Sequence, residues 1–407
     1  MRIVYTNKQI RYLLLTSFAV LFVGMGIFPI LPLYASRFNA SNSMIGIYFS
    51  IIYLSNTAAP MTAAWLAKWI SKKTLLVASG LLGLPALALM ATASSFTQVV
   101  IYTSILWFSG GIILSLVSIF AGLNTDERSR GNAFLILGLA APLGSLAGGA
   151  ATGKLIAMGG YTTLFIALTL WWVIVPLISF FGIKDARAPA APKAAQVSSR
   201  TGKIGLNFYI LSLLTLLATM SVSISRLGTT LSMQALNYSA EEVASTSVVS
   251  GLIVIPIILL IGTIAGRLGH RHTLTLGIML SLAGSLLLFT ATQLWQFWLA
   301  AVLHLMAFSV NGSMAQALST NILQRGVYEK GLSWLNTSIA AANIIIFAVS
   351  GWLFENLGIN PVFLVAALMA LLSAAGLEAL VHTCHEPAPR IQLIKLSCET
   401  EEIQAHA

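Results

Sequence analysis

Charged side chains are scarce in this sequence. Asp, Glu, Lys and Arg make up only 8% of its 407 residues, while 57% of the residues are hydrophobic and the mean hydropathy is +0.88. Soluble domains carry about 25% charged residues. The composition therefore excludes an ordinary soluble domain and predicts a multi-pass protein whose partner is the lipid bilayer.

Cysteine and acidic residues are also few. The two cysteines, Cys384 and Cys398, lie in the polar C-terminal tail, so no disulfide framework or thiolate metal site is indicated, and we predict no cofactor or metal. The 12 acidic residues face 22 Lys and Arg, which gives a net charge of +10. In a soluble chain this excess would suggest nucleic acid, but the sequence shows no soluble domain to carry such a surface. Nucleic acid is not an expected partner.

Twelve apolar runs are long enough to cross a bilayer, which needs about 20 residues per helix. They cover residues 13–34, 45–66, 75–93, 99–123, 133–158, 161–183, 207–231, 243–265, 274–292, 297–323, 332–355 and 361–382. The first run is too long for a removable signal peptide and lacks a small-residue cleavage site, so we expect it to remain as a helix. The predicted fold class is an all-α membrane protein with 12 transmembrane helices.

The basic residues predict an orientation. With a cytoplasmic N-terminus, only Arg37 and Lys154 of the 22 Lys and Arg residues fall outside, and Arg226 falls within a span. Cytoplasmic loops retain Lys and Arg. Both termini are therefore predicted to be cytoplasmic, with a bacterial inner (cytoplasmic) membrane as the location.

The sequence repeats itself at an offset of 198 residues. The matched pairs include Ala67 with Ala265, Asn39 with Asn237, Ser41 with Ser239, Gly153 with Gly351, Gly160 with Gly358 and Phe165 with Phe363. Because six spans separate the partners, the copies point the same way and are related by an axis along the membrane normal. We predict six-helix bundles at 1–183 and 207–382, a cytoplasmic linker at 184–206, rich in Ala, Pro and cations, and a cytoplasmic tail at 383–407.

Three segments on the predicted cytoplasmic side carry recognisable patterns. AWLAKWISKKTLL (64–76) and GTIAGRLGHRHTL (262–274) are similar to the G-x-L-A-D-R-x-G-R-K loop found in each half of the major facilitator superfamily, and DERSRGNAF (126–134) is similar to the loop before its fifth helix. LGLAAPLGSLAGG (137–149) resembles the fifth-helix motif of its drug antiporters. The resemblance covers nearly the whole chain and implies two pseudo-symmetric bundles that move by alternating access.

The resemblance also implies gating residues in these loops: Lys68, Lys72, Lys73, Gly262, Arg267, Gly269, Arg271, Arg128 and Arg130. Two features of the family pattern are missing. The loop aspartate is replaced by Lys68 and Gly266, and ILWFSGGIIL (105–114) lacks the fourth-helix arginine of many proton antiporters.

Ionisable residues within the spans are candidate functional groups, because burying a charge in the bilayer costs several kcal/mol. Arg226 and His304 are predicted at similar depth, near the outer ends of their helices. Arg226 could bind a carboxylate or phosphate, and His304 could carry a coupling proton. The alternatives are that Arg226 snorkels to the interface and that His304 bonds a backbone carbonyl. Glu355 and Glu378, near helix ends, are expected to be solvated.

Polar and aromatic side chains in the spans form a second candidate set for substrate binding: Tyr53, Asn56, Trp107, Asn311, Gln316, Asn336 and Asn343. His304, Phe308 and Asn311 share one helix face. Amides in membrane helices also bridge neighbouring helices, so both roles stay open at this point.

These patterns predict a monomeric transporter, not an enzyme. We expect a secondary transporter of a small organic solute, exporting an amphipathic or anionic compound as an antiporter, with protons as a candidate coupling ion. An uptake permease for a sugar or organic acid is the alternative within this class, and a non-transporting membrane scaffold or sensor is the alternative outside it.

Overall fold

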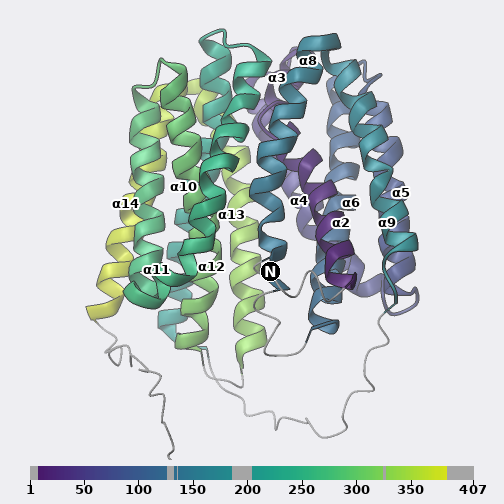
Figure 1. The fold of residues 1–407 in the computed structure, drawn as a ribbon. Helices are drawn as coiled ribbons and strands as arrows, with labels where there is room; N and C mark the ends of the chain where they lie inside the picture. Colours follow the sequence, from purple (N-terminus) through teal and green to yellow (C-terminus); the bar gives the residue numbers. More distant parts are fainter. Residues whose placement is uncertain (1–7, 126–132, 135, 186–203, 324–326, 383–407) are drawn as a thin grey trace, which may run out of the picture.

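The computed structural model describes residues 8–125, 133–134, 136–185, 204–323 and 327–382, and the regular secondary structure of the described chain is helical. The helices are α2 (Lys8–Ile27), α3 (Leu31–Ser36), α4 (Asn42–Leu66), α5 (Lys72–Met90), α6 (Phe96–Leu123), α8 (Ala140–Trp172), α9 (Ile174–Phe181), α10 (Leu206–Ala235), α11 (Ala240–Phe289), α12 (Leu294–Ile322), α13 (Tyr328–Asn356) and α14 (Ile359–His382). The first half of the chain lies mainly on the right of Figure 1 and the second half mainly on the left.

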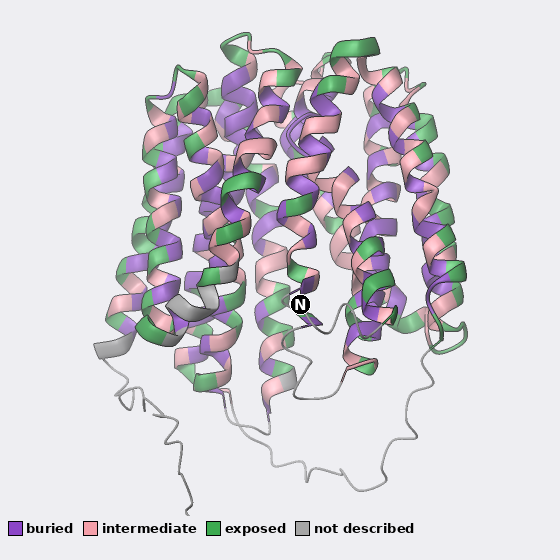
Figure 2. Cartoon of the chain, in the orientation of Figure 1, coloured by how far each residue is buried: buried purple, intermediate pink, exposed green. Residues whose placement is uncertain are grey.

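The helices account for the predicted spans. Eleven described helical segments are long and apolar enough to cross a membrane. One of them, Ile136–Phe181, turns at Gly159 and Gly160, and Gly160 has a φ of +71° that favours glycine. Its two arms, counted separately, give the twelve transmembrane helices expected from the apolar runs. Figure 2 shows exposed and half-buried positions along the length of the helices. Many of the exposed residues are large and apolar, as a lipid-facing surface requires.

The backbone shows the repeat independently of residue identity. Asn39 and Asn237, 198 residues apart, are the non-glycine residues with positive φ in the described chain, at 57° and 61°. Gly160 and Gly358, at the same offset, have φ values of 71° and 81°. Two turns of unusual conformation thus recur at equivalent points of the two halves.

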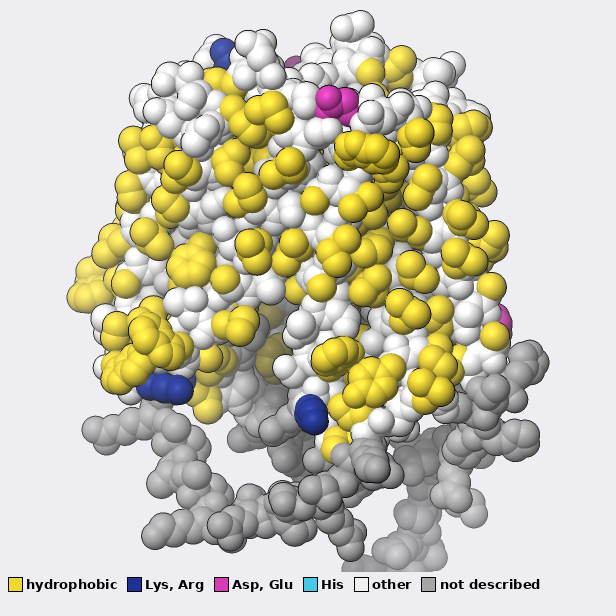
Figure 3. Space-filling model, turned by 180° about the vertical axis from the view of Figure 1, so that it is seen from behind, with side chains coloured by type: hydrophobic (Ala, Val, Ile, Leu, Met, Phe, Trp, Pro, Cys, Tyr) yellow, Lys and Arg dark blue, Asp and Glu magenta, His cyan; other side chains and the backbone are white. Residues whose placement is uncertain are grey.

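The two membrane faces differ in charge. We call the face at which α9 ends and α10 begins the linker face, and the opposite face, at which α4 begins and α13 ends, the far face. The linker face is the lower edge of Figure 1. Figure 3 shows a broad hydrophobic belt with Lys and Arg side chains at its lower edge, and with both acidic and basic side chains near its upper edge.

The two halves are in close contact towards the far face. Gly46 of α4 faces Gly351 of α13 so closely that a Cβ on Gly46 would lie 2.6 Å from the Gly351 Cα. Nearby, the Glu355 carboxylate accepts hydrogen bonds from the Ser41 hydroxyl and the Ser43 backbone N–H, both at 2.8 Å. The Ser36 hydroxyl donates to Gln234 Oε1 at 3.3 Å, and these two residues are themselves 198 apart.

Candidate functional site

A cavity of about 400 Å³ lies midway along the helices, between the two halves. It is lined by Val20, Leu21, Val23, Gly24, Met25, Phe28, Tyr53, Asn56, Thr57, Leu106, Trp107, Gly110, Gly111, Leu114, Trp172, Arg226, Phe308, Asn336, Ile339, Ala340 and Asn343. We call it the main cavity. Its volume is within the range of pockets that hold drug-sized molecules, about 300–1,000 Å³.

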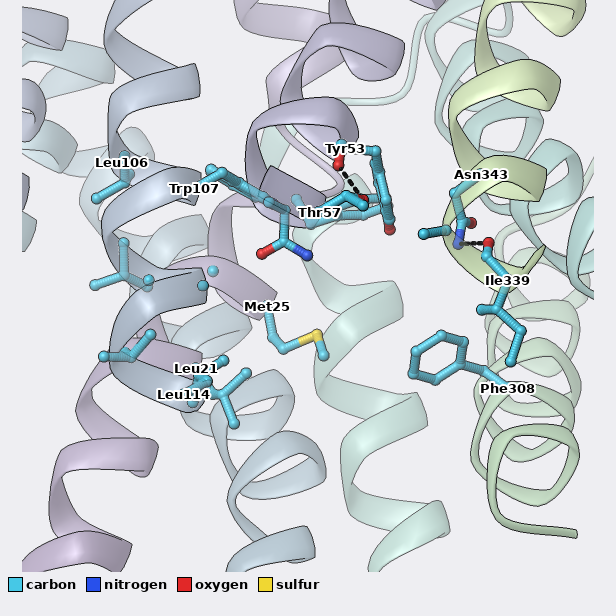
Figure 4. Close-up of a pocket in the computed structure, with 18 of the residues that line it drawn as sticks. Leu21, Met25, Tyr53, Thr57, Leu106, Trp107, Leu114, Phe308, Ile339 and Asn343 are labelled. Carbon is cyan, nitrogen blue, oxygen red and sulfur yellow. Dashed lines mark hydrogen bonds between the residues drawn. The ribbon is translucent and has the colours of Figure 1, made fainter. Parts of the chain in front are cut away.

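The two sides of the main cavity differ in chemistry. Figure 4 shows Leu106, Trp107 and Leu114 on the side of the first half, and Phe308 and Asn343 on the side of the second half. The charged member of the lining, Arg226, also comes from the second half. A ligand spanning the cavity would therefore meet Leu106, Trp107 and Leu114 at one end and the Arg226 cation at the other. The first half also contributes polar side chains to the lining, those of Tyr53, Asn56 and Thr57.

Arg226 is held between aromatic rings. Its guanidinium carbon lies 4.3 Å from the ring centre of Phe28 and 5.5 Å from that of Phe308. Phe28 and Arg226 are 198 residues apart, so the cation stacks on its own counterpart from the other repeat, next to the pseudo-symmetry axis. Within the described chain, Arg226 forms no ion pair and no hydrogen bond. Its five N–H donors are available to a ligand.

The cavity amides are partly committed to neighbouring groups. Asn343 accepts a hydrogen bond from the Ser223 hydroxyl at 2.6 Å and donates to the Ile339 carbonyl at 3.0 Å. Asn336, whose side chain is exposed, accepts from Gln316 Nε2 at 3.3 Å. Because one donor of Asn343 stays free, these amides can both brace α13 and contact a polar ligand.

The first half contributes an unbonded amide. Asn56 has no hydrogen-bond partner in the described chain, and Gly111 leaves it room, since a Cβ there would lie 2.9 Å from Asn56 Oδ1. Gly111 and Thr57 are lining residues that the candidate set omitted. Neither gave a signal, because glycine and threonine are common in membrane helices.

An aromatic layer closes the main cavity towards the far face. The ring centre of Phe347 lies 4.9 Å from that of Tyr53 and 5.5 Å from that of Phe49, and the Phe49 ring contacts Phe28 at 5.3 Å. The contacts join the turn after α2 with α4 and α13, and so join the two halves. At the other end of the lining, Asn336 lies near the linker-face end of α13 and is exposed. A solute would reach this cavity from the linker face.

His304 does not line the main cavity. It is 1% exposed, its Nδ1 lies 2.8 Å from the Ala300 carbonyl, and its Nε2 lies 3.3 Å from the Ser285 hydroxyl. Since a carbonyl only accepts, Nδ1 carries a hydrogen, while the Ser285 hydroxyl beside Nε2 donates its own hydrogen to the Ser281 carbonyl at 2.8 Å. His304 does line a second, smaller cavity together with Arg226.

Two other candidates lie away from the main cavity. Asn311 is 4% exposed, its side chain has no hydrogen-bond partner in the described chain, and it packs against α11, where a Cβ on Gly277 would lie 2.3 Å from Asn311 Oδ1. Gln316 is exposed and contacts the cavity only through Asn336. The i, i+7 spacing from His304 placed Asn311 on the face that packs on α11.

The gating candidates lie at the linker face. Lys68 is exposed, and Lys73 Nζ lies 5.4 Å from the ring centre of Phe180. Lys72 begins α5 and is half-buried, whereas Arg267 is exposed. Gly262 lies within α11, and Arg128 and Arg130 lie outside the described residues.

The second loop contains a turn and an ion pair. Gly269 bends α11 with a φ of 81°, and two residues later Arg271 forms an ion pair with Glu378 of α14. Glu378 also accepts from the Thr275 hydroxyl at 3.2 Å. The Glu378 side chain, expected to be solvated, is 46% exposed and also ties the second repeat's loop to α14. Glu355, also expected to be solvated, is exposed yet bonded to the first half.

Comparison with protein families gives a match over most of the chain. A sequence model described as Major Facilitator Superfamily matches residues 13–223 and, a second time, residues 210–393. The two matches correspond to the two repeats. No curated protein sequence matches the chain.

Several solved transporters share this fold. A bacterial homologue of the human lysosomal transporter Spinster, in an inward-facing and unoccupied conformation, has a TM-score of 0.70 at 13% identity, with 92% of this chain and 96% of that chain covered. A POT family transporter in complex with a thioalcohol-conjugated peptide has a TM-score of 0.76 at 12% identity, covering 93% and 96%. A point mutant of the nucleoside transporter NupG has a TM-score of 0.74 at 13% identity, covering 92% and 100%.

Proposed function

Since the chain belongs to the Major Facilitator Superfamily, and is on that ground a secondary transporter of small solutes, we propose that its solute is an amphipathic organic anion and that the direction is export. The observation that supports this proposal most is Arg226. It is a cation in the cavity between the two halves, and no described residue pairs with it.

The guanidinium favours a carboxylate or phosphate. An unpaired charge within the bilayer is costly, and a charged partner that hydrogen-bonds to it recovers part of that cost. Two parallel N–H groups of Arg match the two oxygens of such a group. The rings of Phe28 and Phe308 hold the side chain in place by cation–π contact. The Arg226 guanidinium is therefore already oriented before a ligand binds.

The rest of the cavity favours an apolar body on the solute. Trp107, Leu106 and Leu114 line the side opposite Phe308 and Asn343 (Figure 4). An aryl or alkyl group would lie against this apolar side while its anionic end reached Arg226. The free donor of Asn343 and the amide of Asn56 could bind a further polar group.

The direction and the coupling complete the proposal. The excess of Lys and Arg supports a cytoplasmic linker face, and the cavity is sealed towards the far face by Phe49, Tyr53 and Phe347. Loading would then occur from the cytoplasm, with release after the far face opens. His304 is the proposed carrier of a coupling proton, because it shares the smaller cavity with Arg226.

Binding of defined probes tests the anion site. We would measure thermal unfolding of the purified protein with benzoate and 4-phenylbutyrate, and with the corresponding neutral amides, at constant ionic strength. The carboxylates should raise the unfolding midpoint saturably and the amides should not. Arg226→Met should abolish the effect, and Arg226→Lys should retain part of it, because lysine keeps the charge but loses the planar fork.

The matched control is Arg267→Met, which removes an exposed cation from the linker face. It should leave carboxylate binding unchanged. Equal responses to amides and carboxylates, or carboxylate binding that survives in Arg226→Met, would contradict the proposal. Benzoate counterflow in proteoliposomes, with and without an imposed pH gradient, then tests transport and the role of His304 through His304→Gln.

A further inference from the structure

A second cavity of about 50 Å³ lies between the main cavity and the far face. Its walls come from α2, α8, α10, α11 and α12, and it shares Met25, Phe28 and Arg226 with the main cavity. We call it the small cavity. A water-sized sphere needs about 10–15 Å³ of such volume, so the space holds a few atoms and excludes an aryl carboxylate.

The lining of the small cavity is rich in hydroxyl groups and carries no acidic side chain. Six residues with hydroxyl groups surround it, and Arg226 is its charged member. Five of the hydroxyls, those of Ser145, Thr229, Thr246, Ser247 and Ser250, donate to backbone carbonyls. The hydroxyl of Thr230 has no hydrogen-bond partner in the described chain, although the residue is only 3% exposed. Thr230 and Arg226 therefore supply the free donors.

His304 adds no donor to this set. Its Nδ1 hydrogen is used by the Ala300 carbonyl, and Nε2 faces Ser285. It is the other titratable group of the small cavity, and Arg226 is the charged group that faces it there. A cation in this space would be repelled by Arg226 without any carboxylate to compensate. A small anion would complement both free donors.

We propose that the small cavity binds a small inorganic monovalent anion of the size of chloride or nitrate, held by the Arg226 guanidinium and the Thr230 hydroxyl. Such an anion neutralises Arg226 on the side away from the main cavity, so the guanidinium keeps a counterion when the main cavity is empty. The site uses a separate space and a separate hydroxyl from the proposed organic solute, and shares with it the Arg226 guanidinium.

The experiment measures thermal unfolding of the full-length purified protein as the concentration of chloride, bromide or nitrate is raised. Gluconate, which is too large for the small cavity, replaces the small anion so that the ionic strength stays constant. The unfolding midpoint should rise saturably with each small anion. Thr230→Val, which keeps the side-chain shape, should raise the half-saturating concentration about tenfold, the effect of losing one hydrogen bond to a charge. Arg226→Met should remove the response.

The control is Thr215→Val, which removes a buried hydroxyl from the same helix, α10, outside both cavities. It should leave the chloride response unchanged. A response that is the same in wild type, Thr230→Val and Arg226→Met would overturn the proposal. Since Arg226→Met could fail to fold, the comparison of Thr230→Val with Thr215→Val is decisive by itself.

Crystals soaked in bromide locate the anion by its anomalous signal. A peak between Arg226 and Thr230 would support the site, and a peak only in the main cavity would overturn it. The two proposals can fail separately. Chloride binding without any benzoate binding would remove the proposed organic solute and leave the small-anion site intact.

Discussion

Two helix crossings between the halves lie towards the far face. They use equivalent positions of the repeat but carry different side chains. In one, α4 crosses α13 with Gly46 against Gly351. In the other, α8 crosses α11 with Gly153 against Ala244, and each residue of this pair lies at an offset of 198 from one of the first. We call them the α4–α13 seam and the α8–α11 seam. The repeat thus places two similar crossings on either side of the pseudo-symmetry axis.

The side chains below the crossings differ. Phe49, Tyr53 and Phe347 in the α4–α13 seam have Ser247, Gly251 and Gly149 as their counterparts in the α8–α11 seam. The aromatic side packs rings from both halves together, whereas the small residues bring backbones close and leave the small cavity beneath them. The α4–α13 seam therefore closes the far face with aromatic rings, whereas the α8–α11 seam leaves the small cavity beside Arg226.

The largest difference between the seams should appear on removing a core side chain. Phe49 is 1% exposed, and Phe49→Ala should lower the free energy of unfolding by about 3–5 kcal/mol, because it leaves a cavity between the halves. Its counterpart change, Ser247→Ala, removes a hydroxyl whose bond to the Met25 carbonyl is 3.4 Å long, and should cost less than about 1 kcal/mol. Denaturant titration in micelles measures both. Equal losses would show that the aromatic layer does not dominate closure.

Adding a methyl group to the glycines at the crossings gives the next contrast. A Cβ on Gly351 would lie 2.6 Å from the Asn42 carbonyl oxygen, whereas a Cβ on Gly153 would make ordinary contacts at 3.4 Å. Overpacking against backbone costs about 1–3 kcal/mol. Gly351→Ala should therefore shift the protein towards a state open at the far face, and Gly153→Ala should not.

Spin labels on Ser94 and Gln293, exposed far-face residues of opposite halves, report this shift as a longer distance. If Gly153→Ala opened the far face as much as Gly351→Ala, the two crossings would be equally tight and the contrast would fail.

Part of this organisation could be predicted from sequence and part could not. Long apolar runs and a fixed repeat offset are strong signals, and they gave the spans and the equivalence of Asn39 with Asn237. Arg226 was also detectable, because a charge within a span is rare. Its stacking on Phe28 was not, since that contact depends on where the pseudo-symmetry axis passes between the halves.

The remaining candidates show the same limit. Asn311 and Asn343 look alike in sequence, yet the rotation of each helix places one against α11 and the other in the main cavity. The small cavity left no signal, because its hydroxyl residues are spread over α8, α10 and α11 and are ordinary in membrane helices.

Because the small cavity and the main cavity share Arg226, we predict that their two ligands, chloride and benzoate, affect each other's binding. If chloride and benzoate both use Arg226, saturating chloride should raise the half-saturating benzoate concentration about tenfold, and benzoate should weaken chloride by the same factor. Isothermal titration in chloride and in gluconate measures both directions. Thr230→Val should reduce the mutual effect while leaving benzoate binding in gluconate unchanged. Independent binding would mean that the two cavities do not share the guanidinium.

The smallest effect concerns the helix ends at the two seams. Ser41 caps α4 and Ser239 caps α11 at equivalent positions, but their carboxylate partners differ. Glu242 completes a capping box within its own helix, whereas Glu355 reaches Ser41 from the other half. Glu355→Gln should therefore lengthen the Ser94 to Gln293 label distance slightly, because it weakens a bond between the halves. Glu242→Gln should only loosen the start of α11, seen as faster amide exchange there. Both carboxylates are exposed, so the two substitutions differ mainly in which half the bonded serine belongs to. If Glu242→Gln also lengthened the label distance, capping would affect the far face through local helix stability and not through a contact between the halves.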